Sequence, residues 1–250
     1  MINTLVRITY DGTNYSGFQL QANAPTVQEE LERALEVIYK QPVRVAGAGR
    51  TDSGVHARGQ AASFQAPFDI AAEKLPYALN ALLPPDIVVV SAEEMTEKFH
   101  ARFDCRRKLY SYTIDYAAFP QVFRRLYSLH LPDPLNLKLI QRAARLFIGT
   151  HDFKAFQAAG GSISETTRTL YRVEPVDYSA EKLLVISFEG SGFLYHMVRL
   201  ISGTLIRAGR ETLSLPEIKA AIKGLNPAAA GPTAPPHGLC LEKVIYDSEI

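Results

Sequence analysis

One short segment, 47-GAGRTDSGVHARGQ-60, concentrates residue types that can do chemistry, with four glycines, two arginines, one aspartate and one histidine. Asp52 lies between Arg50 and Arg58 in sequence, and a nearby guanidinium group favours the ionised form of a carboxyl. An ionised carboxylate serves as a nucleophile or a general base rather than as a general acid. Glycines let the backbone come close to a ligand. The segment therefore predicts a ligand site built around Asp52.

The segment has three other possible interpretations. An Asp-Arg pair that only braces a loop is the structural alternative, and it stays open. Asp-Ser-Gly also occurs in aspartic proteases, but these need two carboxylates that share a proton, and no second Asp-Ser/Thr-Gly triplet occurs in the C-terminal half. The glycine spacing fits neither the G-x-G-x-x-G pattern nor the phosphate-binding P-loop. No nucleotide cofactor is therefore expected.

A second cluster of interest is the basic segment 98-KFHARFDCRRK-108, which is followed by Tyr110 and Tyr112. Tyrosines two residues apart on a strand face the same side. Such tyrosines are either half-buried packing residues, or they stack on a nucleobase while neighbouring cations hold phosphates. The cations expected to do so are Arg106, Arg107 and Lys108, with Arg168 and Arg172 farther along the chain. These arginines form either an RNA-binding surface or a solvated face.

Arg199 interrupts an apolar helical pattern in 192-GFLYHMVRL-200. A charge in such a position must reach water or find an anion, and we expect a buried partner. His196 is interpreted as a core histidine rather than a catalyst. Cys105 and Cys240, the two cysteines, lie far apart without histidines at ligand spacing, so neither a disulfide framework nor a metal site is indicated.

Length and composition limit the classes of protein. The 250 residues are almost half hydrophobic and carry a net charge of +1, so a nucleic-acid partner must be met by a local basic patch rather than by a uniformly basic coat. No apolar run reaches the roughly 18 residues of a membrane span, and the N-terminus lacks the layout of a signal peptide. A cytoplasmic protein is expected.

The pattern of hydrophobic residues predicts alternating strands and helices. Thr26 and Glu29 have the spacing of a capping box, which starts a helix. The second part of the chain repeats the plan of the first, so we expect two related α+β halves, residues 1–104 and 105–250, with mainly antiparallel sheet and flanking helices around a central cleft. The expected strands are 5–10, 60–65, 86–94, 106–116, 181–190 and 239–247, and the expected helices are 27–38, 73–82, 137–147, 191–209 and 216–225.

Five motifs in this order make the sequence resemble the TruA family of tRNA pseudouridine synthases: YDGTNYSGFQLQ, GAGRTDSGVHARGQ, FHARFDCRRKLYSY, GSGFLYHMVR and TAPPHGLCLEKVIYD. The resemblance implies the pseudouridine synthase fold and isomerisation of uridine to pseudouridine at positions 38, 39 and 40 in the anticodon stem-loop of tRNA. It also implies a homodimer that binds tRNA without a cofactor or a metal. Phe18, Ser53 and Cys240 depart from the family's usual residues.

The resemblance assigns roles to individual residues. The catalytic aspartate of the family corresponds to Asp52, its active-site tyrosine to Tyr110, and the arginine that pairs with its aspartate to Arg199. Whether the aspartate attacks C1′, adds to the base or removes a sugar proton stays open. The residues expected to bind the substrate are Tyr110, Arg50, Arg58, Arg106, Arg107, Lys108 and Arg168.

The alternative functions are those of a related synthase that acts on other RNA positions and of a non-catalytic RNA-binding module. A module that only binds RNA has no use for a carboxylate that repels phosphates. Asp52 together with Tyr110 and Arg199 therefore favours an enzyme.

Overall fold

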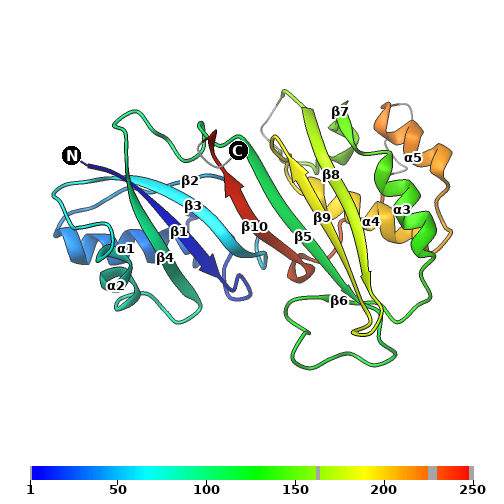
Figure 1. Ribbon diagram of the computed structural model, residues 1–250, viewed down its shortest axis with the longest axis horizontal. Helices are drawn as coiled ribbons and strands as arrows, with labels where there is room; N and C mark the ends of the chain where they lie inside the picture. The colour runs from blue at the N-terminus through cyan, green and yellow to red at the C-terminus, as the bar shows by residue number, and fades with distance from the viewer. Residues whose placement is uncertain (1, 162–163, 225–229, 248–250) are drawn as a thin grey trace. The chain divides into compact units, whose positions relative to one another are not determined.

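A computed structural model describes residues 2–161, 164–224 and 230–247 (Figure 1). The chain forms two compact units, Met1–Arg106 with Cys240–Ile250, and Arg107–Leu239. The halves expected from the sequence, 1–104 and 105–250, differ from these units chiefly at the C-terminus. The last strand belongs with the first unit because Cys240 and Leu241 pair in parallel with His56 and Ala57. Such a long-range pairing leaves no mark in the local sequence.

The first unit is built on a mixed sheet in the order β4-β1-β3-β10. Its central strands are antiparallel, with Val6 opposite Ala62 on one side and Ala92 on the other. The short strand β2 adds to β3, also antiparallel. These strands are β1 (Ile2–Tyr10), β2 (Ala46–Gly47), β3 (His56–Ala66), β4 (Ile87–Met95) and β10 (Leu239–Ile245).

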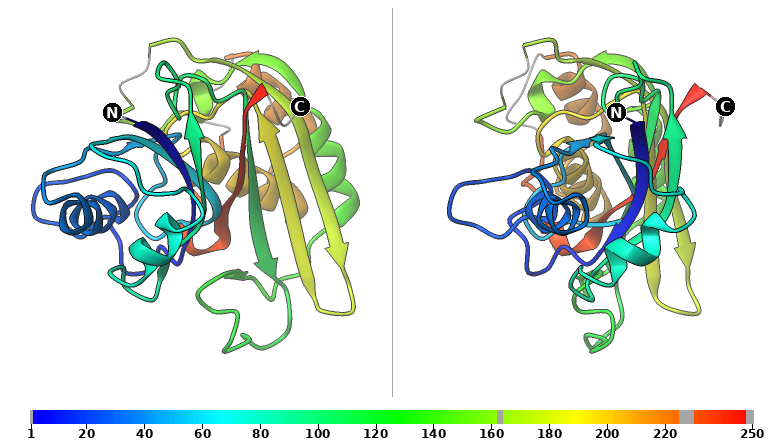
Figure 2. Two further views of the ribbon diagram at one scale, coloured as in Figure 1. Left: turned by 60° about the vertical axis from the view of Figure 1, so that its left-hand side comes forward. Right: turned by 90° about the vertical axis from the view of Figure 1, so that its left-hand side faces the viewer.

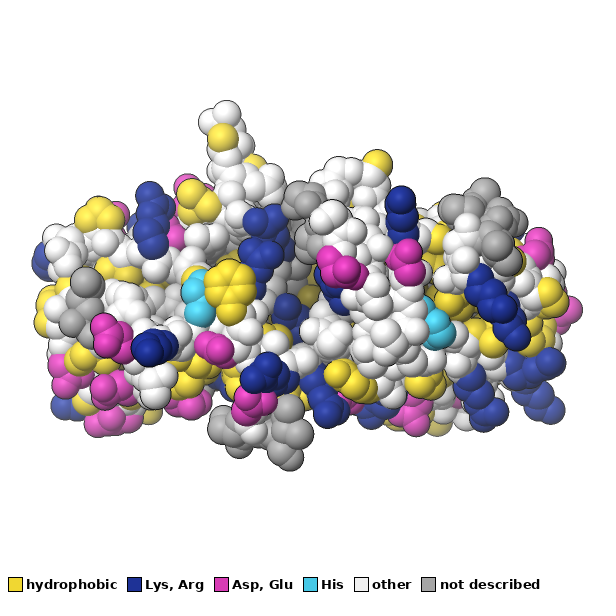
Figure 3. Space-filling model, turned by 90° about the horizontal axis from the view of Figure 1, so that it is seen from above, with side chains coloured by type: hydrophobic (Ala, Val, Ile, Leu, Met, Phe, Trp, Pro, Cys, Tyr) yellow, Lys and Arg dark blue, Asp and Glu magenta, His cyan; other side chains and the backbone are white. Residues whose placement is uncertain are grey.

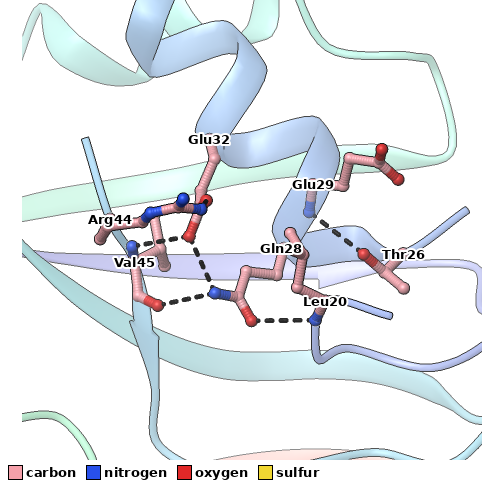
Figure 4. Close-up of polar contacts among 7 residues, drawn as sticks. All are labelled: Leu20, Thr26, Gln28, Glu29, Glu32, Arg44 and Val45. Atoms are coloured by element: carbon pink, nitrogen blue, oxygen red, sulfur yellow. Dashed lines mark hydrogen bonds and ion pairs between the residues drawn. The ribbon is translucent and has the colours of Figure 1, made fainter. Parts of the chain in front are cut away.

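Helix α1 (Val27–Tyr39) begins at the residue that its sequence signature predicts, since the Thr26 side chain accepts a hydrogen bond from the backbone nitrogen of Glu29 over 3.3 Å. Side chains on its first turns then fix the helix to its surroundings (Figure 4). The Gln28 amide bonds to Leu20 and to Val45, and Glu32 accepts from the backbone nitrogen of Val45 over 3.0 Å. The chain that enters the glycine-rich segment is therefore held against α1.

Helix α2 (Leu75–Asn80) is shorter than the expected 73–82. It packs against β4, where the Asn80 side chain exchanges two hydrogen bonds with the backbone of Val89. The Tyr39 ring at the end of α1 meets the ring of Phe64 on β3 at 6.3 Å. The hydrophobic core of the first unit thus lies between its helices and its sheet.

The second unit contains an antiparallel sheet in the order β5-β9-β8-β7, with helices on one face (Figure 2). The short strand β6 runs parallel to β5. The strands are β5 (Arg107–Asp115), β6 (Leu129–His130), β7 (Gly149–Asp152), β8 (Thr167–Tyr178) and β9 (Leu183–Gly190). The helices are α3 (Leu137–Arg145), α4 (Met197–Gly209) and α5 (Leu215–Ile222), and the 3-10 turns are η1 (Lys154–Phe156) and η3 (Pro236–Gly238).

The helix expected at 191–209 begins only at Met197. His196 has a φ of 58°, which lies in the left-handed region and cannot continue a right-handed helix. Phe193 therefore precedes α4, although its spacing to Met197 suggested that both belong to one helix.

The architecture is α+β with a mostly antiparallel sheet, and the expected fold class is confirmed. Within the described ranges, no helix is both long and apolar enough to cross a membrane.

Candidate active site

The loop that carries Asp52 is held against the segment that follows β1. Gly12 and Gly17, both in that segment, make the close approach possible. A Cβ on Gly12 would lie 2.0 Å from the carbonyl oxygen of Val55, and one on Gly17 would lie 2.5 Å from that of Thr51. Real Cβ atoms do not come so close, so each position requires glycine. The two motifs YDGTNYSGF and GAGRTDSGVHARGQ therefore form a single structural element.

Backbone hydrogen bonds hold the loop on both sides of Asp52. The nitrogen of Phe18 donates to the oxygen of Thr51 over 3.2 Å, and the nitrogen of Gly54 donates to the oxygen of Tyr15 over 3.2 Å. The nitrogen of Val55 closes a turn onto the oxygen of Asp52 over 3.1 Å. Asp52 itself is partly exposed, so the geometry presents a carboxylate from a backbone that is fixed at its flanking residues.

His56 follows the loop and is buried at the start of β3. Its Nδ1 atom accepts a hydrogen bond from the backbone nitrogen of Gly12 over 3.1 Å and lies 3.1 Å from a carboxylate oxygen of Asp11. No role for His56 was predicted from the sequence, although this histidine lies in the same motif as Asp52. Its hydrogen-bond partner Gly12 is 44 residues away, and a local sequence pattern does not predict such a contact.

The two arginines of the motif differ in their surroundings. The Arg50 side chain is exposed and has no hydrogen bond or ion pair with the described part of the chain. Arg58 lies on β3, where its guanidinium pairs with Glu242 of β10 at 3.0 Å. Both arginines belong to the same motif as Asp52, and Arg58 has an acidic partner on the neighbouring strand.

The basic segment within the first unit presents aromatic rings and cations together. Phe103 is 73% exposed, and its ring lies 4.4 Å from the ring of His100, with the Arg102 guanidinium 5.8 Å from it. Arg106 forms two 2.8 Å hydrogen bonds with Asp247, which hold the pKa of that carboxyl below its usual range. An exposed ring beside an imidazole and a guanidinium is a suitable surface for stacking on RNA bases.

Strand β5 separates the residues that the sequence had grouped. Tyr110 is buried, and its ring meets that of Phe193 edge-on at 5.1 Å. Lys108 and Tyr112 share its side of the strand, whereas Arg107 faces the opposite side because side chains alternate. Arg107 and Tyr110 therefore lie on opposite faces of the sheet.

Arg107 has its own partners on that opposite side. It pairs with Glu189 at 3.0 Å, and its guanidinium lies 4.4 Å from the centre of the Tyr171 ring. These contacts hold Arg107 on the face of the sheet opposite Tyr110.

Arg199 lies in the first turn of α4, half-buried. Its Nε atom donates to the carbonyl oxygen of Ala234 over 2.7 Å. Burial raises the pKa of Tyr112, whose hydroxyl donates to Pro235 over 2.9 Å, and the charge of Arg199 opposes that rise. Arg199 thus donates to the backbone carbonyl of Ala234 and acts electrostatically on the buried Tyr112.

Arg168 on β8 is half-buried and donates from one nitrogen to the carbonyl oxygens of Glu165 and Thr167. On the face drawn in Figure 3, basic side chains are interspersed with acidic ones. No group of three or more metal-binding side chains occurs in the ranges that the structure describes.

Comparison with known proteins defines the class. The sequence model of the family described as tRNA pseudouridine synthase matches residues 7–104 and 143–247, ranges that include Asp52 and Arg199 but not Tyr110. The chain belongs to the tRNA pseudouridine synthase family. It is an enzyme, an isomerase that converts uridine to pseudouridine in tRNA, as the sequence resemblance implied.

Two curated relatives share nearly the whole chain. The tRNA pseudouridine synthase A of Thermoanaerobacter sp. (strain X514) is 46% identical over 249 residues, covering 98% of this chain and 100% of the relative. The protein of the same name from Bacillus subtilis (strain 168) is 46% identical over 243 residues, covering 96% and 98%. A chain in the crystal structure of a Cbf5-Nop10-Gar1 complex has a TM-score of 0.43 and 10% identity, covering 96% of this chain and 48% of that one.

Proposed function

We propose that this enzyme isomerises uridine at positions 38, 39 and 40 in the anticodon stem-loop of tRNA, with Asp52 as the nucleophile. The observation that carries the proposal is the fixed loop around Asp52. Its backbone is held at Thr51 and Gly54, while the aspartate between them stays partly exposed. A carboxylate presented in this way is preorganised for a substrate, which is the main protein contribution to such catalysis.

The reaction explains the choice of residue. The bond between N1 and C1′ breaks, the uracil turns within the site, and a bond between C5 and C1′ forms. The hydrogen on C5 is lost to solvent, and N1 takes up a proton. Asp52 supplies the carboxylate that acts at the ribose or the base. Tyr110 stacks on the uracil and assists removal of the C5 proton, and Arg199 pairs with the carboxylate and orients it, as the family resemblance implies.

The target uridine must leave the helical stack, because its glycosidic bond is otherwise out of reach. A side chain is then needed in the space that the base vacates. Arg50 suits this role, since it is exposed, lies two residues from Asp52 and has no partner in the described part of the chain. Arg58 contributes instead to the RNA-facing charge, because its guanidinium is already paired with Glu242.

The three adjacent target positions differ in sequence, so hydrogen bonds to base edges cannot recognise all of them. The enzyme therefore recognises the shape and the phosphates of the folded RNA. The RNA-contacting residues are those of the segment 98–108 together with Arg168. The exposed Phe103 ring, beside Arg102 and His100, supports such a contact.

The active species is a homodimer in which one tRNA contacts both subunits, and it acts in the cytoplasm, where tRNA is modified. These two points rest on the resemblance and on the substrate. Sedimentation equilibrium of the purified protein tests the first, with a mass of two chains expected and a mass of one chain contradicting it.

The test of the target positions is to map pseudouridine in unmodified tRNA transcripts after incubation with the enzyme. Transcripts with a single uridine at position 38, 39 or 40 should each be modified, and a transcript with cytidine at all three should not. Pseudouridine at other positions would identify a related synthase instead. Binding without any conversion would identify an RNA-binding module.

A further inference from the structure

A buried polar network lies directly behind the loop that carries Asp52. Tyr10 on β1 is 4% exposed, Thr51 is 5% exposed and Gln60 on β3 is fully buried. The hydroxyl oxygens of Tyr10 and Thr51 lie 2.7 Å apart and share a hydrogen bond. Thr51 is the residue immediately before Asp52, so this bond joins the sheet to the loop by a side chain as well as by the backbone.

Gln60 completes the network from the neighbouring strand. Its amide nitrogen donates to the carbonyl oxygen of Gly49 over 2.9 Å and to the hydroxyl of Tyr10 over 3.5 Å. Its amide oxygen accepts from the backbone nitrogen of Ala61 over 3.1 Å. The network therefore grips the loop at two points on the N-terminal side of Asp52, Gly49 and Thr51.

Burial raises the pKa of the Tyr10 hydroxyl above its usual value, so this hydroxyl is protonated at neutral pH. Gln60 donates to the hydroxyl oxygen, so the hydroxyl hydrogen is available for Thr51. The ring of Tyr10 is separately held by packing, with its centre 6.4 Å from that of Phe18. Removal of the oxygen alone would therefore leave the ring in place and free the Thr51 side chain, while the backbone bond from Phe18 to Thr51 remains.

We propose that the Tyr10 hydroxyl is a positioning group for the isomerisation, which sets the orientation of Asp52 through its bond to Thr51. The inference rests on the proposed role of Asp52. Tyr10 does not touch the substrate, and its effect is on the geometry of the loop. Displacement of a reacting group by about 1 Å can cost as much as about a hundredfold in rate, so a side chain that fixes the preceding residue can matter as much as one in contact with substrate.

The test compares four single variants of the full chain by single-turnover tritium release from tRNA labelled with [5-³H]uridine, together with tRNA affinity. Tyr10→Phe and Thr51→Val remove one partner each from the shared bond, and Thr51→Ser keeps the hydroxyl. Tyr246→Phe is the matched control, because it removes another buried tyrosine hydroxyl of the same unit, one that donates to the carbonyl oxygen of Ala101 over 2.9 Å. Urea unfolding of each variant accompanies the rates.

The expected result is a loss of about tenfold in the single-turnover rate for Tyr10→Phe and Thr51→Val, with unchanged tRNA affinity. Thr51→Ser and Tyr246→Phe should react at the wild-type rate. The double variant Tyr10→Phe/Thr51→Val should be no slower than the slower single variant, because the two substitutions remove the same hydrogen bond.

The inference is wrong if Tyr10→Phe reacts like wild type, if Tyr246→Phe is slowed as much, or if the two losses multiply. Should Tyr10→Phe fail to fold, Thr51→Val against Thr51→Ser decides alone. Asp52→Ala is assayed alongside. If Asp52→Ala retains activity, the proposed function of that residue fails, whereas an inactive Asp52→Ala with a fully active Tyr10→Phe overturns only the positioning role.

Discussion

Gly17 lies so close to Thr51 that a Cβ on Gly17 would be 2.5 Å from the Thr51 carbonyl oxygen. The φ of Gly17 is +98°, a backbone conformation that residues other than glycine rarely adopt. The position of the loop that carries Asp52 therefore depends on the absence of a methyl group at a residue 35 positions earlier in the chain.

Gly17→Ala is expected to destabilise the protein by about 1–3 kcal/mol from backbone strain alone, and to lower the turnover rate as well. Urea unfolding and tritium release measure the two effects. Gly160→Ala is the control, because Gly160 has a φ of +89° but no atom of the described residues lies within 4 Å of an added Cβ. It should lose stability without losing activity. Equal activity of the two variants would show that the close approach to Thr51 has no catalytic consequence.

Arg50→Ala is expected to slow the single-turnover reaction by tenfold or more, about 1.4 kcal/mol in the barrier, if its side chain replaces the extruded base. Arg58→Ala should be affected less, because its guanidinium is paired with Glu242 at 3.0 Å. Rates with saturating enzyme separate this effect from weaker RNA binding. A larger loss in Arg58→Ala than in Arg50→Ala would reverse the assignment.

Arg106→Ala should weaken tRNA binding and reduce the slope of log K against log salt by about 1, as expected for one lost phosphate contact. Filter binding at several salt concentrations measures the slope. Arg33→Ala is the control, since Arg33 pairs with Glu30 on α1, outside the basic segment. An unchanged slope in Arg106→Ala would mean that its bidentate pair with Asp247 persists when RNA binds.

The Cys240 thiol should be almost unreactive in the folded protein. Burial raises its pKa to about 12, with a smaller contribution from the charge of Glu242. The thiolate is the reactive form, so alkylation by iodoacetamide at pH 8 should be far slower in the native protein than in urea. Peptide mass spectrometry measures both rates.

The raised pKa of Cys240 also determines how the stability of the protein depends on pH. Folding favours the neutral thiol, so the stabilisation is present below the unfolded pKa of about 8.5 and is lost as the pH rises toward the folded value. Cys240→Ala should therefore flatten the loss of stability on the alkaline side. Rapid alkylation of Cys240 by iodoacetamide at pH 8 in the native protein would contradict the raised pKa of its thiol.

Local signals in the sequence predicted several elements well. The helix at Val27–Tyr39 was legible because Thr26 caps it and its apolar residues recur at helical spacing. Strand β5 and the helix that begins at Leu137 were legible for the same kind of reason. The predicted start of α4 was wrong because His196 adopts a left-handed conformation that its residue type does not predict.

The sequence led to a candidate site but not to the contacts that hold its loop in place. Asp52 was proposed from the composition of its own loop, whereas Tyr10, Gly12 and Gly17 contact residues tens of positions away. The placement of Arg107 on the face opposite Tyr110 could have been predicted, because alternation along a strand decides it. The pairing of Arg58 with Glu242 could not, because it needs the parallel pairing of β3 with β10.

The most direct test of the role of Asp52 is tritium release from [5-³H]uridine-labelled tRNA by the wild type and by Asp52→Ala, with tRNA binding measured in parallel. The account predicts release by the wild type, none by the variant, and unimpaired binding by both. Release by Asp52→Ala at the wild-type rate would contradict it.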